Sequence, residues 1–137
     1  TGYSTLYGDT VGGFAVLKDI PKTLVYRLAK WRNTQKEIIP VGIITRPPSA
    51  ELAEGQVDQD SLPEYDILDE ILYRLMELKQ SSDDIIQDGL DADTVNKIAR
   101  LLKFNEYKRR QSAPGPRISE GAFALDWRYP LSHGFKY

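Results

Sequence analysis

Apolar residues recur at helical spacing in three stretches of this chain, and no clear strand pattern lies between them. Each stretch places its larger apolar side chains on one face, as an amphipathic helix does. We predict helices from about Asp19–Pro21 to Arg32, from Glu64 to Lys79 and from Ala92 to Arg109, with a short helix near Asp83–Asp88 that Gly89 could end. The segment "IIPVGIIT" is a short strand or an extended connector. The chain is therefore predicted to be mostly helical, and without strands between the helices it cannot build a complete parallel α/β sheet alone.

The helical spacing also places apolar residues on one side of each helix, and those of the third helix should point inward. For the first helix these are Leu24, Val25, Leu28 and Trp31; for the second Leu68, Ile71, Leu72, Leu75 and Leu78; for the third Val95, Ile98, Leu101 and Leu102. At the start of the first helix, Asp19 and Pro21 are typical N-terminal residues.

The composition excludes several classes of protein. The 137 residues make one domain or a piece of one, and a net charge of −2 disfavours non-specific binding to nucleic acid or to an acidic membrane surface. No apolar run approaches the roughly 18 residues of a membrane span. With no cysteine and a single histidine, His133, neither a thiolate zinc site nor a Ser/His/Asp triad is credible. We expect a cytoplasmic protein.

The segment from Thr45 to Asp66 is unusually long for an irregular connection. It contains three prolines and six carboxylates: Glu51, Glu54, Asp58, Asp60, Glu64 and Asp66. Compact domains rarely keep such a loop unless it is a lid, a binding loop or disordered. The pattern by itself leaves these alternatives open.

Single residues suggest chemistry without deciding it. In "YGDTVGG", Asp9 could hold a metal or a sugar hydroxyl, or the motif could be a structural turn. Lys22 lies in the first turn of a helix, where a cation is unfavourable unless an anion lies there too; the alternative is a solvated lysine. The Ser49 hydroxyl either caps a short helix or donates to a phosphate, and the pattern favours the cap.

Two further segments carry charge. In "NEYKRRQ", Lys108, Arg109 and Arg110 could stabilise a helix C-terminus, or some could meet phosphate or carboxylate groups. The tail "PGPRISEGAFALDWRYP" mixes charged side chains with aromatic ones. We expect a docked, ordered tail in which Arg117, Asp126 and Arg128 make buried ion pairs beside Phe123, Trp127 and Tyr129.

Taken in chain order, three segments resemble glutamine-dependent NAD synthetases: "GYSTLYGDTVGGFAVLKDIPKTLVYRL", "IITRPPSAELAEGQVDQDSLPEYDILDEIL" and "NEYKRRQSAPGPRISEGAF". The resemblance implies an ATP-pyrophosphatase domain with a Rossmann-like, doubly wound α/β fold, of which residues 1–137 would be the C-terminal part. Such enzymes use ATP and magnesium to adenylate deamido-NAD. Ammonia made from glutamine then attacks the acyl-adenylate, giving NAD and AMP.

The resemblance also implies roles for single residues. Lys22 and Ser49 would bind ATP, and Lys108 with Tyr107 would bind deamido-NAD. Asp9 would lie near the reacting carboxylate and magnesium. Residues 45–66, with Arg46, would form a lid over the substrates, in which Asp58 and Asp60 bind ammonium or structural partners. Shorter, ammonia-dependent relatives have an aspartate that binds deamido-NAD where this chain has Gly13.

The chain also departs from the family pattern. It contains neither the phosphate-binding SGGxDS motif nor the nucleophilic cysteine of a glutaminase domain. We therefore expect these residues to be inactive alone and to work with the remainder of the synthetase domain and a glutaminase domain, in a homo-oligomer. The alternative is a non-catalytic remnant with a nucleotide surface, or an oligomer-interface domain.

Overall fold

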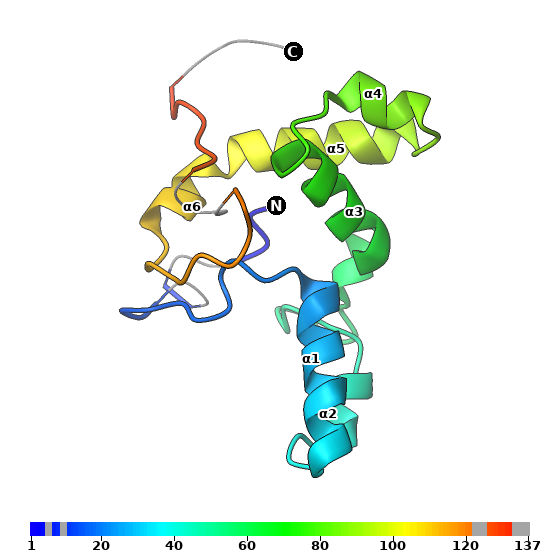
Figure 1. Ribbon diagram of the computed structural model, residues 1–137, viewed down its shortest axis with the longest axis vertical. Coiled ribbons are helices and arrows are strands. Elements are labelled where there is room, and N and C mark those ends of the chain that lie inside the picture. The colour runs from blue at the N-terminus through cyan, green and yellow to red at the C-terminus, as the bar shows by residue number, and fades with distance from the viewer. Residues whose placement is uncertain (5–6, 9–10, 122–125, 133–137) are drawn as a thin grey trace. The chain divides into compact units, whose positions relative to one another are not determined.

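A computed structural model describes residues 1–4, 7–8, 11–121 and 126–132. Over these residues the structure contains helices and turns but no strand, so the prediction of a mostly helical chain is confirmed. The helices are α1 (Lys22–Gln35), α2 (Val41–Thr45), α3 (Tyr65–Met76), α4 (Ser82–Gln87), α5 (Ala92–Phe104) and α6 (Glu106–Gln111), with a short 3-10 turn, η1 (Asp58–Asp60) (Figure 1). The chain divides into two units, Ile20–Glu70 and Thr1–Asp19 with Ile71–Tyr137. We call them the loop unit and the helix unit.

The apolar core of the helix unit lies where the second half of α3, α4 and α5 contribute their buried side chains. These are Ile71, Met76, Ile85, Val95, Ile98 and Leu102. Side chains cap the two later helices. Ser81 and Asp84 form a reciprocal capping box at α4, and the Asp91 carboxylate accepts the Thr94 N–H at 2.8 Å at α5. Gly89 follows α4 with a φ of +102°, as its predicted role in ending that helix requires.

The prediction of one continuous helix from Ala92 to Arg109 is wrong, because the chain breaks at Asn105. There the backbone leaves the helical region with φ −98° and ψ 17°. The Asn105 side chain donates to the Leu101 carbonyl and to the Thr1 carbonyl, each at 2.8 Å. Asparagine competes with the helix for backbone hydrogen bonds in this way. The result is a separate α6, which carries the charged "EYKRRQ" segment.

The segment 112–119 lies against residues 15–19 within the helix unit. The Ala15 N–H donates to the Pro114 carbonyl at 2.7 Å, and the Lys18 ammonium donates to the Ala113 carbonyl at 2.7 Å. A Cβ on Gly115 would approach the Ala15 carbonyl oxygen to 2.4 Å, so this close approach requires glycine. This part of the tail is docked, as predicted.

Asp19 lies just before the first helix, as predicted, but its side chain does not cap that helix. Its carboxylate instead accepts the backbone N–H groups of Ile118 and Ser119, both at 2.7 Å, and the Ser119 hydroxyl at 2.9 Å. Pro21 takes the N-cap position of α1 without any side-chain cap. Asp19 is thus a buried anchor for the tail.

Two expectations for the loop unit are wrong. First, no residue of α1 is buried, and Leu28 and Trp31 are 43% and 61% exposed, so the predicted apolar face is not covered. Second, "IIPVGIIT" contains helix α2 instead of an extended segment. The Asn33 carboxamide oxygen accepts the N–H groups of Ile38 and Ile39, both at 3.1 Å. These bonds occupy backbone donors that a strand would need for pairing, and Pro40 then takes the N-cap position before α2 begins at Val41.

Candidate functional site

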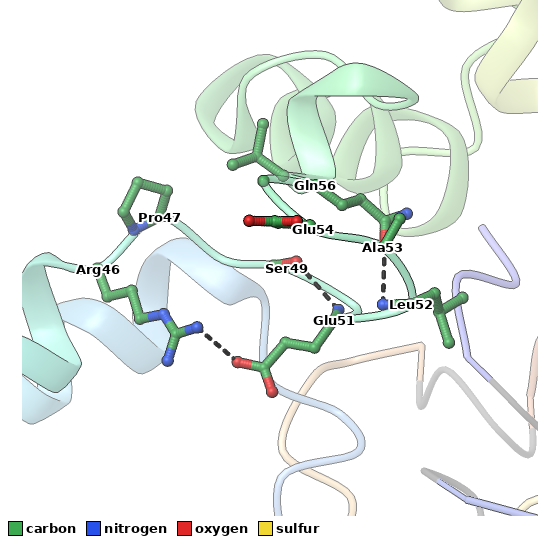
Figure 2. Close-up of a pocket in the computed structure, with 10 residues that line it drawn as sticks. Arg46, Pro47, Ser49, Glu51, Leu52, Ala53, Glu54 and Gln56 are labelled. Atoms are coloured by element: carbon green, nitrogen blue, oxygen red, sulfur yellow. Dashed lines mark hydrogen bonds and ion pairs between the residues drawn. The ribbon is translucent and has the colours of Figure 1, made fainter.

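The long loop encloses an open hollow of about 550 Å³ (Figure 2). Arg46 forms an ion pair with Glu51 across it at 2.8 Å, and both side chains are largely exposed, so the pair contributes little stability. The Ser49 hydroxyl accepts the Glu51 N–H at 3.0 Å, but no helix follows. The prediction that Ser49 caps a helix is therefore wrong. Its hydroxyl lines the hollow, and its hydrogen can still be donated to a ligand.

The C-terminal end of the loop is fixed by two carboxylates. Asp60 accepts the Val57 N–H at 2.9 Å, which closes the turn η1. Asp58 is buried, with 5% of its surface exposed; its N–H donates to the Pro48 carbonyl, and its Oδ2 accepts the Tyr65 hydroxyl at 2.5 Å. Within the described part of the chain, its Oδ1 has no hydrogen-bond partner. Both aspartates have structural partners, and ammonium binding stays a prediction.

Lys22 lies between two aromatic rings of the loop unit. Its ammonium nitrogen is 5.9 Å from the ring centre of Tyr26 and 5.7 Å from that of Tyr65. The next residue, Thr23, donates its N–H to the Asp69 carboxylate at 2.8 Å. An anion thus does lie at this helix N-terminus, and Asp69 supplies it. Lys22 is not a plainly solvated lysine.

In the helix unit, Lys108 joins the first sequence motif to the third. Its ammonium donates to the Gly2 carbonyl at 2.6 Å and to the Ser4 carbonyl at 2.7 Å. A lysine ammonium has three N–H donors, so these bonds to the described residues account for two of them. Tyr107 beside it is 42% exposed. Asp9 lies outside the described residues, and its predicted role in catalysis or magnesium binding stays a prediction.

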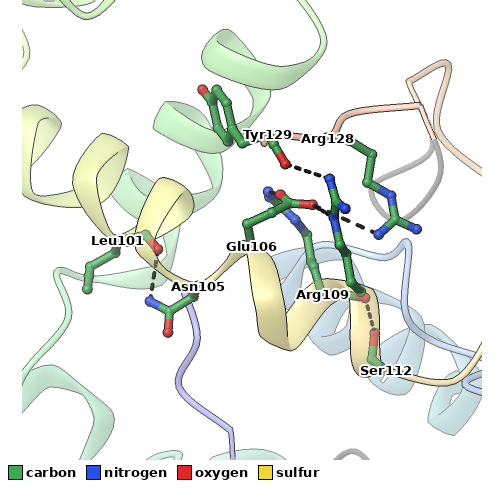
Figure 3. Close-up of polar contacts among 8 residues, drawn as sticks. Leu101, Asn105, Glu106, Arg109, Ser112, Arg128 and Tyr129 are labelled. Atoms are coloured by element: carbon green, nitrogen blue, oxygen red, sulfur yellow. Dashed lines mark hydrogen bonds and ion pairs between the residues drawn. The ribbon is translucent and has the colours of Figure 1, made fainter. Parts of the chain in front are cut away.

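Glu106 is the centre of a charge cluster that the sequence analysis missed (Figure 3). It is 1% exposed and pairs with Arg109, with Arg110 at 3.2 Å and with Arg128 at 3.9 Å. The Arg109 guanidinium lies 5.2 Å from the Trp127 ring centre, and Arg110 donates to the Tyr129 carbonyl at 2.7 Å. The spacing of Glu106 to the two following arginines, three and four residues on, was the available signal.

This cluster confirms one part of the tail prediction and corrects another. Arg128 does meet a buried carboxylate, but that carboxylate belongs to Glu106. Arg117 pairs with Asp126 at 3.0 Å, yet the two side chains are 58% and 43% exposed, so this is a surface ion pair. Of the aromatic residues, Trp127 and Tyr129 pack edge to face at 4.7 Å, and Phe123 lies outside the described residues.

The pKa of Glu106 follows from competing effects. Burial alone raises it, because a charged carboxylate loses its hydration. Hydrogen bonds from Arg109, from the Tyr129 backbone and from Arg110, together with the positive charge of Arg109, lower it. The net pKa lies below the ordinary value of 4.5, so Glu106 is ionised at neutral pH.

Comparisons with known proteins decide the family. The model of the family described as NAD synthase matches residues 1–112. The glutamine-dependent NAD(+) synthetase of Acinetobacter baylyi is 61% identical over 137 residues, which cover 98% of this chain. The chain belongs to the NAD synthase family. The predicted resemblance is therefore confirmed.

Other members of the NAD synthase family agree. The glutamine-dependent NAD(+) synthetase of Xanthomonas campestris pv. campestris is 55% identical over 98% of this chain. The structure of the glutamine-dependent NAD+ synthetase from Acinetobacter baumannii in complex with ADP is 51% identical, with a TM-score of 0.50, and covers 95% of this chain. The chain spans about a quarter of the length of the curated relatives, 25% in each of the two named here. No helix in the described residues is both long and apolar enough to cross a membrane.

Proposed function

We propose that this chain is the C-terminal part of the synthetase domain of a cytoplasmic, homo-oligomeric, glutamine-dependent NAD synthetase. The complete enzyme would convert deamido-NAD into NAD, using ATP and ammonia released from glutamine. The observation that carries the proposal is the 61% identity to a glutamine-dependent synthetase over 98% of the chain. The ADP complex of the A. baumannii relative supports nucleotide binding, and the likeness to that structure supports a Rossmann-like ATP-pyrophosphatase fold for the complete domain.

The proposed reaction has two steps. A carboxylate is a poor electrophile, so ATP first converts the nicotinate carboxylate into an acyl-adenylate and releases pyrophosphate. Ammonia then attacks the activated carbonyl, and AMP leaves. Ammonia needs no strong base for this attack. The protein must instead bring two anionic nucleotides together, offset their charge and exclude water, which would hydrolyse the intermediate.

Residues of the loop unit fit the ATP side of this reaction. The Lys22 ammonium would neutralise ATP phosphate charge, and the Ser49 hydroxyl would donate a hydrogen bond to the nucleotide. Arg46 and Ser49 both line the hollow within the loop. The described residues contain no group of three or more carboxylate or histidine side chains placed to hold a metal by themselves.

We expect the loop to act as a lid, and proteolysis tests this. A glutamate-specific protease should cut the complete enzyme between Glu51 and Glu64, because the glutamates of this loop are exposed. Binding of ATP, magnesium and deamido-NAD should slow that cleavage at least several-fold. Cleavage after Glu37, which is exposed outside the loop, is the internal control and should not change. Equal cleavage rates in the loop with and without substrates would refute the lid.

Lys108 and Tyr107 fit the deamido-NAD side. The third N–H of Lys108 would donate to a carboxylate or phosphate of that substrate. In the complete enzyme, Lys108→Ala should raise the KM for deamido-NAD by about tenfold or more, because a hydrogen bond to a charged group contributes about 1.5–3 kcal/mol. The KM for ATP should change less than about twofold.

The matched control for this variant is Lys30→Ala, which removes the same charge from an exposed position on α1. Steady-state kinetics with ammonium as nitrogen donor measure both substrates without the glutaminase. An unchanged KM for deamido-NAD in Lys108→Ala would argue against this role.

One observation favours the alternative, an oligomer-interface role. Large apolar side chains of α1, α2 and the connection between them are exposed: Leu28, Trp31, Ile38, Val41 and Ile43. Contiguous exposed apolar side chains commonly mark an interaction surface. This role is compatible with catalysis elsewhere in the chain, and sedimentation of the complete enzyme with Trp31→Ser would test it. A smaller assembly would support it, and an unchanged one would contradict it.

A further inference from the structure

We propose that Tyr65 is a positioning residue that connects Lys22 to the long loop. Its ring holds the Lys22 ammonium, and its hydroxyl is fixed by Asp58 of the loop. This inference rests on the proposed function, in which Lys22 binds ATP phosphate. The inference gives Tyr65 a role in ATP binding. It also explains how the loop can influence the position of the Lys22 ammonium.

Side chains at the start of α3 contact the first turn of α1. Lys22 and Tyr26 are four residues apart on α1, so they share a face. Tyr65 and Asp69 are four apart on α3 and share a face for the same reason. Tyr65 meets Lys22, and Asp69 accepts the Thr23 N–H at 2.8 Å. Two contacts of different kinds therefore hold the first turn of α1 against the first turns of α3.

A hydrogen bond to the loop fixes the Tyr65 hydroxyl. Asp58 belongs to the turn η1 within the loop, and its carboxylate accepts the Tyr65 hydroxyl at 2.5 Å. Burial raises the pKa of Tyr65 above its ordinary value of 10.0, and the hydrogen bond and charge of Asp58 raise it further. The hydroxyl therefore stays protonated and remains a donor to Asp58 at any pH at which the enzyme works.

Asp58 is a buried carboxylate with one oxygen that lacks a hydrogen-bond partner among the described residues. It is 5% exposed, and within the described residues its Oδ1 has no hydrogen-bond partner. A buried carboxylate oxygen without a donor is costly, so its remaining bonds are important. The Tyr65 hydroxyl donates to the other oxygen, Oδ2. A ring fixed in this way keeps the Lys22 ammonium near one place, which reduces the entropy lost when a phosphate binds.

Steady-state kinetics of the complete enzyme test the proposal, with ATP varied and ammonium as nitrogen donor. Tyr65→Leu, which lacks both ring and hydroxyl, should raise the KM for ATP about two- to fivefold, the effect of a cation–π contact at a partly exposed site. The kcat and the KM for deamido-NAD should stay near wild type. Asp58→Asn keeps an oxygen acceptor for Tyr65 and should retain the wild-type KM for ATP, whereas Asp58→Ala should raise it. Tyr73→Phe, at an exposed tyrosine of the same helix, is the matched control.

A double substitution separates this proposal from the one it rests on. Lys22→Met alone should raise the KM for ATP, and Tyr65→Leu should add nothing to it. If Lys22→Met raises the KM and Tyr65→Leu raises it further by its full factor, the positioning role is overturned while the ATP role of Lys22 stands. If Lys22→Met leaves the KM for ATP unchanged, the ATP role fails and the positioning role fails with it.

A spectroscopic measurement covers the case in which Tyr65→Leu does not fold. With lysines labelled as 13C-dimethyl groups, the Lys22 signal of the otherwise unsubstituted enzyme should be shifted upfield by the two rings and should disappear in Lys22→Arg. Tyr65→Phe should keep most of this shift because it keeps the ring. A Lys22 signal at the position of exposed lysines would overturn the proposal.

Discussion

Replacing Glu106 by alanine should free residues 126–132 from α6 and lower local stability by about 3–5 kcal/mol. The reason is that this substitution removes a carboxylate that pairs with Arg109, Arg110 and Arg128. Removing one partner of a buried ion pair is strongly destabilising because the other charge stays buried, and here that charge is chiefly Arg109, which is 7% exposed. A glutamine at this position should recover part of the loss by accepting hydrogen bonds.

Hydrogen exchange in the complete enzyme measures this effect where it occurs. Amides of residues 106–112 should exchange at least about a hundredfold faster in Glu106→Ala, since each 1.4 kcal/mol is a factor of ten. The matched control is Glu120→Ala, at an exposed glutamate of the same unit, which should leave these amides unchanged. Wild-type exchange rates in Glu106→Ala would contradict the role of the cluster.

The same cluster predicts a pH dependence. The pKa of folded Glu106 is below its ordinary value of 4.5, so the unfolded state binds more protons between the two values. The contribution of Glu106 to stability is therefore fully present above about pH 4.5 and is lost as the pH falls through the folded pKa. Protection of residues 106–112 should fall in acid in the wild type and fall less in Glu106→Gln.

Asp19→Ala should be the second most damaging substitution, at about 2–3 kcal/mol. The Asp19 carboxylate is the shared acceptor for two backbone N–H groups and the hydroxyl of residues 118–119. Hydrogen bonds to a charged acceptor are worth more than neutral ones, and the donors would be left partly buried. Residues 112–121 should be cut by a protease faster than they are in the wild type.

Limited proteolysis with mass spectrometry of the fragments checks this result. Asp83→Ala, at an exposed position in the first turn of α4, is the control and should leave cleavage of the tail unchanged. Asp19→Asn should lie between the alanine variant and wild type, because it keeps one oxygen acceptor. A tail equally protected in Asp19→Ala and wild type would show that Asp19 does not anchor it.

Local sequence rules predicted the parts of the fold that local chemistry determines. The spacing of Val95, Ile98 and Leu102 identified the buried face of α5, and Gly89 marked the end of α4. The family followed from three motifs in order, because long motifs in register carry more information than single residues. By contrast, the apolar face of α1 contains no buried residue, since periodicity shows a face but not what covers it.

The remaining errors come from contacts between residues distant in sequence. Asp19 stands where a helix start is expected, but its carboxylate accepts hydrogen bonds from residues 118–119, about a hundred positions later in the chain. Asn105 ends a helix partly through the carbonyl of Thr1. Glu106 resembles a surface residue in the sequence, because its ion pair with Arg128 of the tail joins segments that are distant in the chain. In the candidate site, the sequence selected Lys22 and Asp58, but the tyrosine that joins them could be recognised only in three dimensions.

The central claim is that these residues form part of an enzyme that makes NAD through an acyl-adenylate. Its most direct test is product analysis of the full-length protein that carries them, supplied with deamido-NAD, ATP, magnesium and glutamine. We predict that NAD, AMP and pyrophosphate form in equal amounts, and that Lys22→Met lowers the rate at limiting ATP. Absence of NAD, or ATP breakdown that does not depend on deamido-NAD, would contradict the claim.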